Sequence, residues 1–137
     1  MPGDVPAALL DANILLRYLT GDPEALADRA RALMEGAERG EVRLLLIPLT
    51  VAECVWVLKS FYKQPPSAIA SALQQVMALD GLEVEQEGLV GAALMNMARH
   101  NVDFADAYLA EVARRQGLGI ATFDRDFGRL GVKLLPV

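Results

Sequence analysis

The chain has 137 residues, 53% of them apolar, and a formal net charge of −5. This composition is enough for one hydrophobic core of ordinary domain size and excludes a disordered chain. The apolar runs fall far short of the roughly 20 residues that span a bilayer, and the single cysteine excludes an internal disulfide and a cysteine-based zinc cluster.

Localisation and partners are constrained by the charges. The first residues, "MPGDVPAALLDANILL", carry an acid where a secretory leader carries basic residues, which favours a cytoplasmic chain without a membrane anchor. An acidic chain is an unusual nucleic-acid binder. That objection weakens if several acids share one pocket, because a bound cation reverses the local sign of charge.

Short apolar runs alternate with helical segments along the whole chain. The expected strands, in chain order, are 7–11, 42–48, 82–86, 118–124 and 132–137. The expected helices are 13–21, 22–40, 50–63, 65–81, 87–101 and 103–117, with a short helical turn at 125–130. This alternation predicts a single α/β domain over 1–137, a three-layer sandwich around a mostly parallel five-stranded sheet.

Two acids end predicted strands. Asp11 closes the first strand and Asp124 closes the fourth. Parallel sheets bind ligands at the carboxyl ends of their strands, where strand order reverses, so both positions suit a site. Both aspartates also suit the N-cap of the helix or turn that follows, with Asn13 an alternative cap for the first.

Glu53 stands in the apolar run "VAECVWVLKS". Burying a carboxylate without a partner is costly, so we expect Glu53 to face a charge or a polar cleft. Thr50-x-x-Glu53 also matches a capping box, which would place Glu53 at a helix mouth. The two interpretations are compatible.

Asp103 and Asp106 open the helix predicted for 103–117. Asp103 suits the N-cap, and Asp106 is a first-turn acid that the helix dipole favours. Three residues apart, they share one side of the helix. Apolar neighbours, among them Phe104 and Leu109, indicate that Asp106 points into the protein. Asp126 is interpreted as a solvated neighbour of Asp124.

Four acids at four element ends indicate a metal site. Carboxylates crowded in a cleft repel one another unless one is protonated or a cation lies between them. An all-oxygen donor set suits Mg²⁺ or Mn²⁺. A histidine pair is impossible because His100 is the only histidine, no phosphate-binding loop or nucleophile elbow is present, and Cys54 is interpreted as a core residue.

Four motifs in order resemble the PIN-domain family, and within it the VapC-type toxins of prokaryotic toxin–antitoxin pairs. They are "LLDANILLRYL", "TVAECVWVL", "VDFADAYLA" and "IATFDRDF". The resemblance covers almost the whole chain and implies the strand order 3-2-1-4-5. It places the family's acidic quartet on Asp11, Glu53, Asp106 and Asp124, with Asn13 and Thr122 as auxiliary positions and Asp103 and Asp126 as nearby acids.

The resemblance implies a metal-dependent endoribonuclease, with Mg²⁺ or Mn²⁺ held by the quartet. It also implies an RNA substrate, a cognate antitoxin and a homodimer. Basic side chains near the acidic motifs are candidates for guiding the RNA backbone: Arg17, Lys59, Lys63 and Arg125.

Three other functions compete. A receiver domain that accepts a phosphoryl group beside Mg²⁺ has a similar length, but it needs paired acids after its first strand, where Asp11 stands alone. A non-catalytic PIN-like interaction module would keep the fold without binding a metal. A DNA-directed flap nuclease or exonuclease of related fold needs extra clamping elements that this chain is too short to hold.

Overall fold

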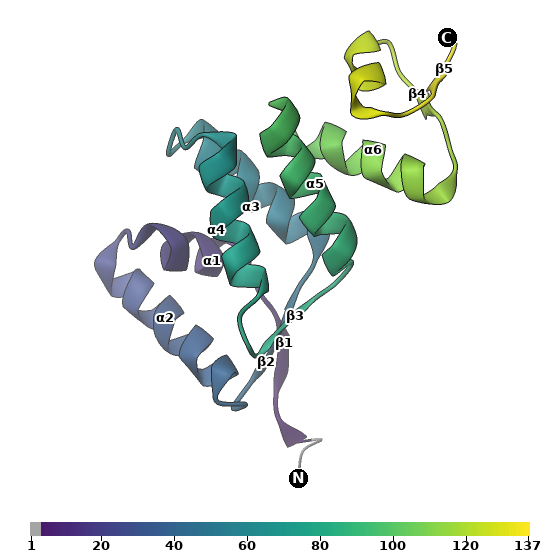
Figure 1. The fold of residues 1–137 in the computed structure, drawn as a ribbon. Coiled ribbons are helices and arrows are strands. Elements are labelled where there is room, and N and C mark those ends of the chain that lie inside the picture. Colours follow the sequence, from purple (N-terminus) through teal and green to yellow (C-terminus); the bar gives the residue numbers. More distant parts are fainter. Residues whose placement is uncertain (1–3) are drawn as a thin grey trace. The chain divides into compact units, whose positions relative to one another are not determined.

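A computed structural model describes residues 4–137, and the first three residues of the N-terminal stretch considered above lie outside this range. The described chain divides between Gln86 and Glu87 into two compact units, unit 1 and unit 2, each described here by itself (Figure 1). The strands are β1 (Ala7–Leu9), β2 (Arg43–Leu46), β3 (Leu82–Val84), β4 (Ile120–Ala121) and β5 (Leu134–Leu135). The helices are α1 (Ala12–Thr20), α2 (Glu24–Glu38), α3 (Pro48–Ser60), α4 (Pro66–Met77), α5 (Glu87–His100), α6 (Phe104–Gln116) and the short 3₁₀ helix η2 (Arg125–Leu130).

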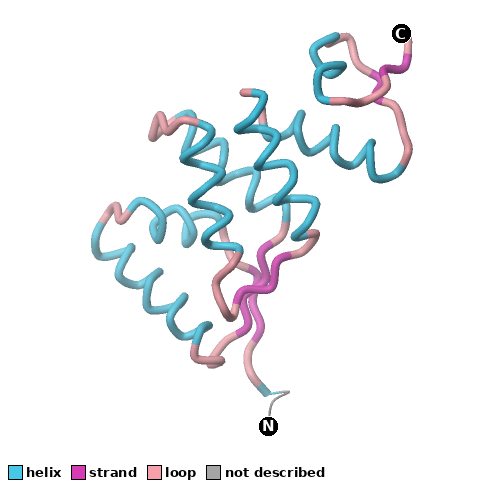
Figure 2. The backbone as a smooth tube through the Cα atoms, in the orientation of Figure 1, coloured by secondary structure: helices cyan, strands magenta, loops and turns pink. Residues whose placement is uncertain are grey.

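Unit 1 contains a three-stranded parallel sheet in the order β1-β2-β3. Ala8 lies opposite Leu44, and Leu44 lies opposite Leu82. Figure 2 shows these strands side by side in magenta. Each crossover runs through a pair of helices, α1 and α2 after β1, and α3 and α4 after β2, as parallel pairing requires.

The helices of unit 1 form its core with the sheet. α1 packs against α2 and α3, and α3 packs against α4. The largest buried side chains come from four elements: Leu15 of α1, Leu44 and Leu46 of β2, Leu58 of α3 and Leu73 of α4. Each contributes about 1.5–3 kcal/mol by leaving water. This packing holds α1 and α3 side by side, just after the carboxyl ends of β1 and β2.

Unit 2 contains the α5–α6 pair, η2 and a parallel β4–β5 pair. Ile120 lies opposite Leu134 in that pair. Ala110 of α6 packs with Phe127 and Leu130 of η2 in a small core. Four partly buried apolar residues complete this core: Val102, Ile120, Val132 and Leu134. The core therefore joins η2 to both α6 and the strand pair.

The α/β class is confirmed, and the observed strand pairs agree with both ends of the predicted order. Among residues 4–137, the hydrogen-bonded pairs are β1–β2, β2–β3 and β4–β5. Pairing of the first strand with the fourth, and hence one five-stranded sheet in a single domain, stays a prediction. No helix in the described part of the chain has the length and apolar character needed to cross a bilayer.

Two helix starts differ from the sequence expectation. α2, expected from residue 22, begins at Glu24 with Pro23 as its N-cap. α3 begins at Pro48, so Thr50 lies inside its first turn and the proposed capping box with Glu53 is wrong. Proline is favoured at the first helical position because its missing N–H is not needed there. This preference explains why α3 starts at Pro48, two residues before the predicted start at Thr50.

Candidate active site

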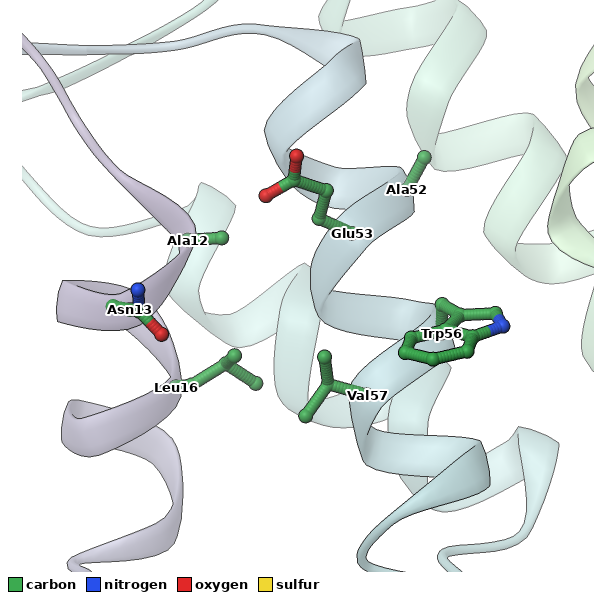
Figure 3. A pocket seen from close by; sticks show the side chains of 7 residues that line it. All are labelled: Ala12, Asn13, Leu16, Ala52, Glu53, Trp56 and Val57. Atoms are coloured by element: carbon green, nitrogen blue, oxygen red, sulfur yellow. The ribbon is translucent and has the colours of Figure 1, made fainter.

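A pocket of about 450 Å³ lies between α1 and α3 of unit 1 (Figure 3). Its lining is mostly apolar, with Leu16 of α1 and Val57 of α3 facing each other across the gap. Two polar residues of the predicted set, Asn13 and Glu53, also line it. The pocket therefore has an apolar floor and a polar end.

Asp11 and Glu53 both act electrostatically on one buried thiol, that of Cys54. Cys54 is fully buried, and its Sγ lies 3.9 Å from the carbonyl oxygen of Ala12. Burial, followed by the negative charges of Glu53 and Asp11, raises the pKa of the Cys54 thiol to about 12. The two carboxylates thus act on one point of unit 1. Its complete burial confirms Cys54 as the core residue that the sequence predicted, and a thiol with this pKa stays protonated at neutral pH.

Glu53 is exposed and lines the pocket, so the apolar residues beside it in the sequence do not enclose its carboxylate. The buried side of α3 consists of Val51, Cys54, Val55 and Leu58. Glu53 and Trp56, three residues apart, lie on another side, and the Trp56 side chain is 68% exposed. The helical period of the apolar residues could have revealed this orientation.

A second hollow, of about 190 Å³, lies within unit 2 and is rich in acids. Asp103 and Asp106 of the α6 start and Asp124 and Asp126 of the η2 start all line it. Burial, then the charge of Asp103 and then that of Asp124, raises the pKa of the Asp106 carboxyl. Two members of the predicted quartet, Asp106 and Asp124, thus line one hollow within unit 2.

Asp124 is held by two local hydrogen bonds. Its backbone N–H donates to Thr122 Oγ1 at 3.0 Å, and its Oδ1 accepts the backbone N–H of Asp126 at 2.9 Å. The capping role expected for Asp124 is therefore observed at the start of η2. One carboxylate oxygen is engaged in this cap, and the side chain still borders the acidic hollow.

The other acids are less enclosed than expected. Asp11 stands at the N-cap of α1, and its backbone carbonyl accepts from Ile14 and Leu15; within the described chain its carboxylate makes no capping hydrogen bond. Asp106 is half-buried, and the neighbouring Leu109 is exposed. Arg129 of η2 also lines the acidic hollow, which places a cation beside the acids. No sequence motif indicated this arginine.

The four basic candidates lie at the surface or at element ends. Arg17 Nη1 donates to the backbone oxygen of Asp22 at 3.3 Å, near the end of α1. Lys59, Lys63 and Arg125 are exposed. Arg125 follows Asp124 directly and opens η2.

The predicted quartet is divided between the two units. Asp11 and Glu53 belong to unit 1, whereas Asp106 and Asp124 belong to unit 2. Across residues 4–137, no three or more His, Cys, Asp or Glu side chains lie together as a metal-binding group. A metal site made by all four acids therefore needs both units.

Comparison with known proteins identifies the family of this chain. The model of the PIN domain matches residues 8–133, so the chain belongs to the PIN domain family, as its four motifs indicated. It is also similar to the VapC ribonuclease of Aquifex aeolicus (strain VF5), with 25% identity over 126 residues. That alignment covers 91% of this chain and 93% of the relative.

Proposed function

We propose that the chain is a divalent-metal-dependent endoribonuclease and the toxin of a VapBC-type toxin–antitoxin pair. The observation that carries the proposal is the position of Asp106, a half-buried carboxylate whose pKa is raised by burial and by Asp103 and Asp124, inside a PIN domain. The similarity to a protein named as a ribonuclease supports RNA as the substrate. Family membership removes the receiver-domain alternative.

The donor set fits Mg²⁺ or Mn²⁺. Asp11, Glu53, Asp106 and Asp124 offer only carboxylate oxygens, the donors that these ions prefer. In the proposed fold β1 and β4 pair, which unites the two units in one domain with the order 3-2-1-4-5. The acids that follow β1 and β4 then meet at the switch point of the sheet, where parallel α/β folds bind ligands.

The residues of the chain have distinct roles in this proposal. A divalent cation supplies activation of a water nucleophile and neutralisation of charge on the phosphate. Asp11, Asp106 and Asp124 bind it, and Glu53 binds it or orients the attacking water. Thr122 positions Asp124 through the hydrogen bond to its N–H. Asn13, Asp103 and Asp126 lie close to these groups and serve as auxiliary polar contacts.

RNA and protein partners complete the proposal. Arg17, Lys59, Lys63 and Arg125 guide the RNA backbone, since phosphate contacts come mostly from Arg and Lys. A cognate antitoxin silences the enzyme, and the toxin acts as a homodimer.

A non-catalytic PIN module is the remaining alternative, and it predicts no Mn²⁺ binding in a calorimetric titration.

The experiment is RNA cleavage by variants that remove one charge at a time. Asp11→Asn, Glu53→Gln and Asp106→Asn should each lower EDTA-sensitive cleavage at least about 100-fold, because even residues that only orient metal ligands cost 10–100-fold. Glu38→Gln, an exposed residue at the end of α2, is the control and should cleave normally. Undiminished cleavage in all three acid variants, with circular dichroism unchanged, would refute the proposal.

A further inference from the structure

One side of α6 faces η2 along its whole length. Asp106, Ala110 and Arg114 are spaced four residues apart, so they follow one another along that side. Asp106 and Asp124 line the same hollow, and Ala110 packs with Phe127 and Leu130. At the far end, Arg114 Nη1 donates to the backbone oxygen of Leu130. Asp106, Ala110 and Arg114 are therefore each near η2 or the acid that caps it.

Arg114 is held in place by Glu111. Its Nη2 donates to Glu111 Oε2, and the Glu111 side chain is only 12% exposed. The pKa of the Glu111 carboxyl is lowered: burial alone would raise it, but the hydrogen bonds and charges of Arg114 and Arg115 outweigh burial. The Arg114 side chain is 30% exposed, and a Cβ added at Gly131, just after η2, would lie 3.9 Å from Arg114 Nη1. The guanidinium thus sits at the end of η2.

Both ends of η2 are therefore held by hydrogen bonds. At its start, Asp124 accepts the N–H of Asp126. At its end, Leu130 accepts from Arg114. The 6 residues of η2 thus link the contact with Arg114 to the start of the helix, where the candidate ligand Asp124 is located.

We propose that Arg114, held by Glu111, is a positioning residue that keeps Asp124 at the distance from Asp106 that metal binding needs. The inference rests on the proposed function, since it assigns both aspartates to the metal. Arg114 does not itself contact the metal or RNA in this scheme. Residues that orient metal ligands from behind typically change affinity or activity 10–100-fold when lost.

The neighbouring arginine provides a matched control. Arg115 Nε donates to the other oxygen of Glu111 at 3.0 Å, but its Nη2 donates to the backbone oxygen of Gly88 in α5, at 3.2 Å. Arg114 and Arg115 thus share one carboxylate and differ in the element they hold. If both arginines only form structural ion pairs, losing either one should change the Mn²⁺ affinity to a similar extent. If Arg114 is a positioning residue, only its loss should lower the Mn²⁺ affinity.

The experiment compares Arg114→Ala with Arg115→Ala in the full chain. In metal-free protein, hydrogen exchange of the Asp126 amide should become about 5-fold faster in Arg114→Ala, the effect of losing one hydrogen bond, and should not change in Arg115→Ala. Calorimetric titration with Mn²⁺ should give a Kd about 10-fold higher in Arg114→Ala and unchanged in Arg115→Ala. Arg114→Lys keeps one donor and should recover part of the affinity, and it replaces Arg114→Ala if that variant fails to fold.

The outcomes separate this inference from the proposed function. Wild-type Mn²⁺ affinity in Arg114→Ala, or an equal loss in Arg115→Ala, would overturn the inference alone. A wild-type chain that bound no Mn²⁺ would overturn the proposed function and this inference together. Selective loss of Mn²⁺ affinity in Arg114→Ala, with accelerated exchange of the Asp126 amide, would establish the positioning role.

Discussion

The acids of unit 2 differ in how their charge is held. Asp124 accepts the backbone N–H of Asp126, which engages one of its carboxylate oxygens in the cap of η2. Asp106 instead combines partial burial with the negative charges of Asp103 and Asp124, and its pKa is raised. Asp106 is therefore the acid whose ionised form destabilises the metal-free protein.

The first prediction concerns Asp106→Asn without metal. Because the pKa of Asp106 is raised, the folded chain holds this proton more tightly than the unfolded chain. The free energy of unfolding then falls as pH rises from the usual aspartate pKa of about 3.9 toward the raised value. Asparagine removes this loss, so in EDTA the Tm of Asp106→Asn should exceed that of the wild type at pH 7, and the difference should shrink toward pH 4.

Glu38→Gln is the control for this comparison, because it removes one exposed charge at a distance from the acidic hollow along the chain. Thermal melts of the three proteins between pH 4 and pH 7 provide the measurement. A lower Tm of Asp106→Asn at pH 7 would contradict the crowding of carboxylates in unit 2. Adding Mg²⁺ should reverse the order of the wild type and Asp106→Asn at pH 7, since Asp106→Asn lacks one of the proposed ligands.

The orientation of a residue was harder to predict than its type. The sequence indicated Glu53 correctly as an acid on a helix, but its apolar neighbours suggested burial. The helix resolves this, because residues 51, 54, 55 and 58 form the buried side and Glu53 lies outside it. A run of neighbours along the chain is a poor guide where side chains turn by about 100° per residue.

At the scale of elements, the junction between α4 and β3 depends on a close approach to α2. Gly81 has φ +87, and a Cβ built there would lie 2.2 Å from the backbone oxygen of Ala37 in α2. Backbone atoms cannot move away as a flexible side chain can. Gly81 is thus required both by its conformation and by the absence of space.

The second prediction follows from this contact. Gly81→Ala should lower the free energy of unfolding by about 2–5 kcal/mol, because overpacking adds about 1–3 kcal/mol to the roughly 1–2 kcal/mol cost of a left-handed backbone. Gly40→Ala is the matched control, since Gly40 has φ +78 and open space around its Cβ position. Gly40→Ala should lower the free energy of unfolding only by the roughly 1–2 kcal/mol cost of the left-handed backbone. Urea denaturation measures both, and equal losses would contradict the steric part of the argument.

Helices were easier to predict than strands because their signals are local. The short turn at 125–130 is η2 as observed, with Asp124 as its cap. The fourth strand was expected over 118–124, yet β4 contains only Ile120 and Ala121. A strand extends only as far as its hydrogen-bonded partner, and partners lie far away in the sequence. Apolar runs therefore indicate strands but not their ends.

At the scale of the whole molecule, the candidate site was predictable as two halves. Asp11 follows β1 and Asp124 follows β4, as the strand-end argument required. In unit 1 burial, Glu53 and Asp11 raise the pKa of the Cys54 thiol, and in unit 2 burial, Asp103 and Asp124 raise the pKa of the Asp106 carboxyl. The proposed joining of both halves in one metal site depends on pairing of β1 with β4. These strands are far apart in the sequence, and single-sequence patterns do not specify such pairing.

The last prediction tests that union directly. If Asp11 and Asp106 bind the same ion, removing either one already impairs the site, and removing both costs less than the product of the single effects. Mn²⁺ titrations monitored by electron paramagnetic resonance give the Kd of each variant. The fold-increase in Kd for Asp11→Asn/Asp106→Asn should be well below the product of the fold-increases for the two single variants. Far-ultraviolet circular dichroism checks that each variant is folded.

Pairing Asp11→Asn with Glu38→Gln provides the reference, because Glu38 belongs to unit 1 but has no role in the proposed site. The fold-changes in Mn²⁺ Kd caused by those two substitutions should multiply. Glu38→Gln by itself should change the Kd little. Multiplicative effects of Asp11→Asn and Asp106→Asn would mean that the two units bind separate ions. The proposed single domain with one shared metal centre would then be wrong, even if both halves bound Mn²⁺ and the chain cleaved RNA.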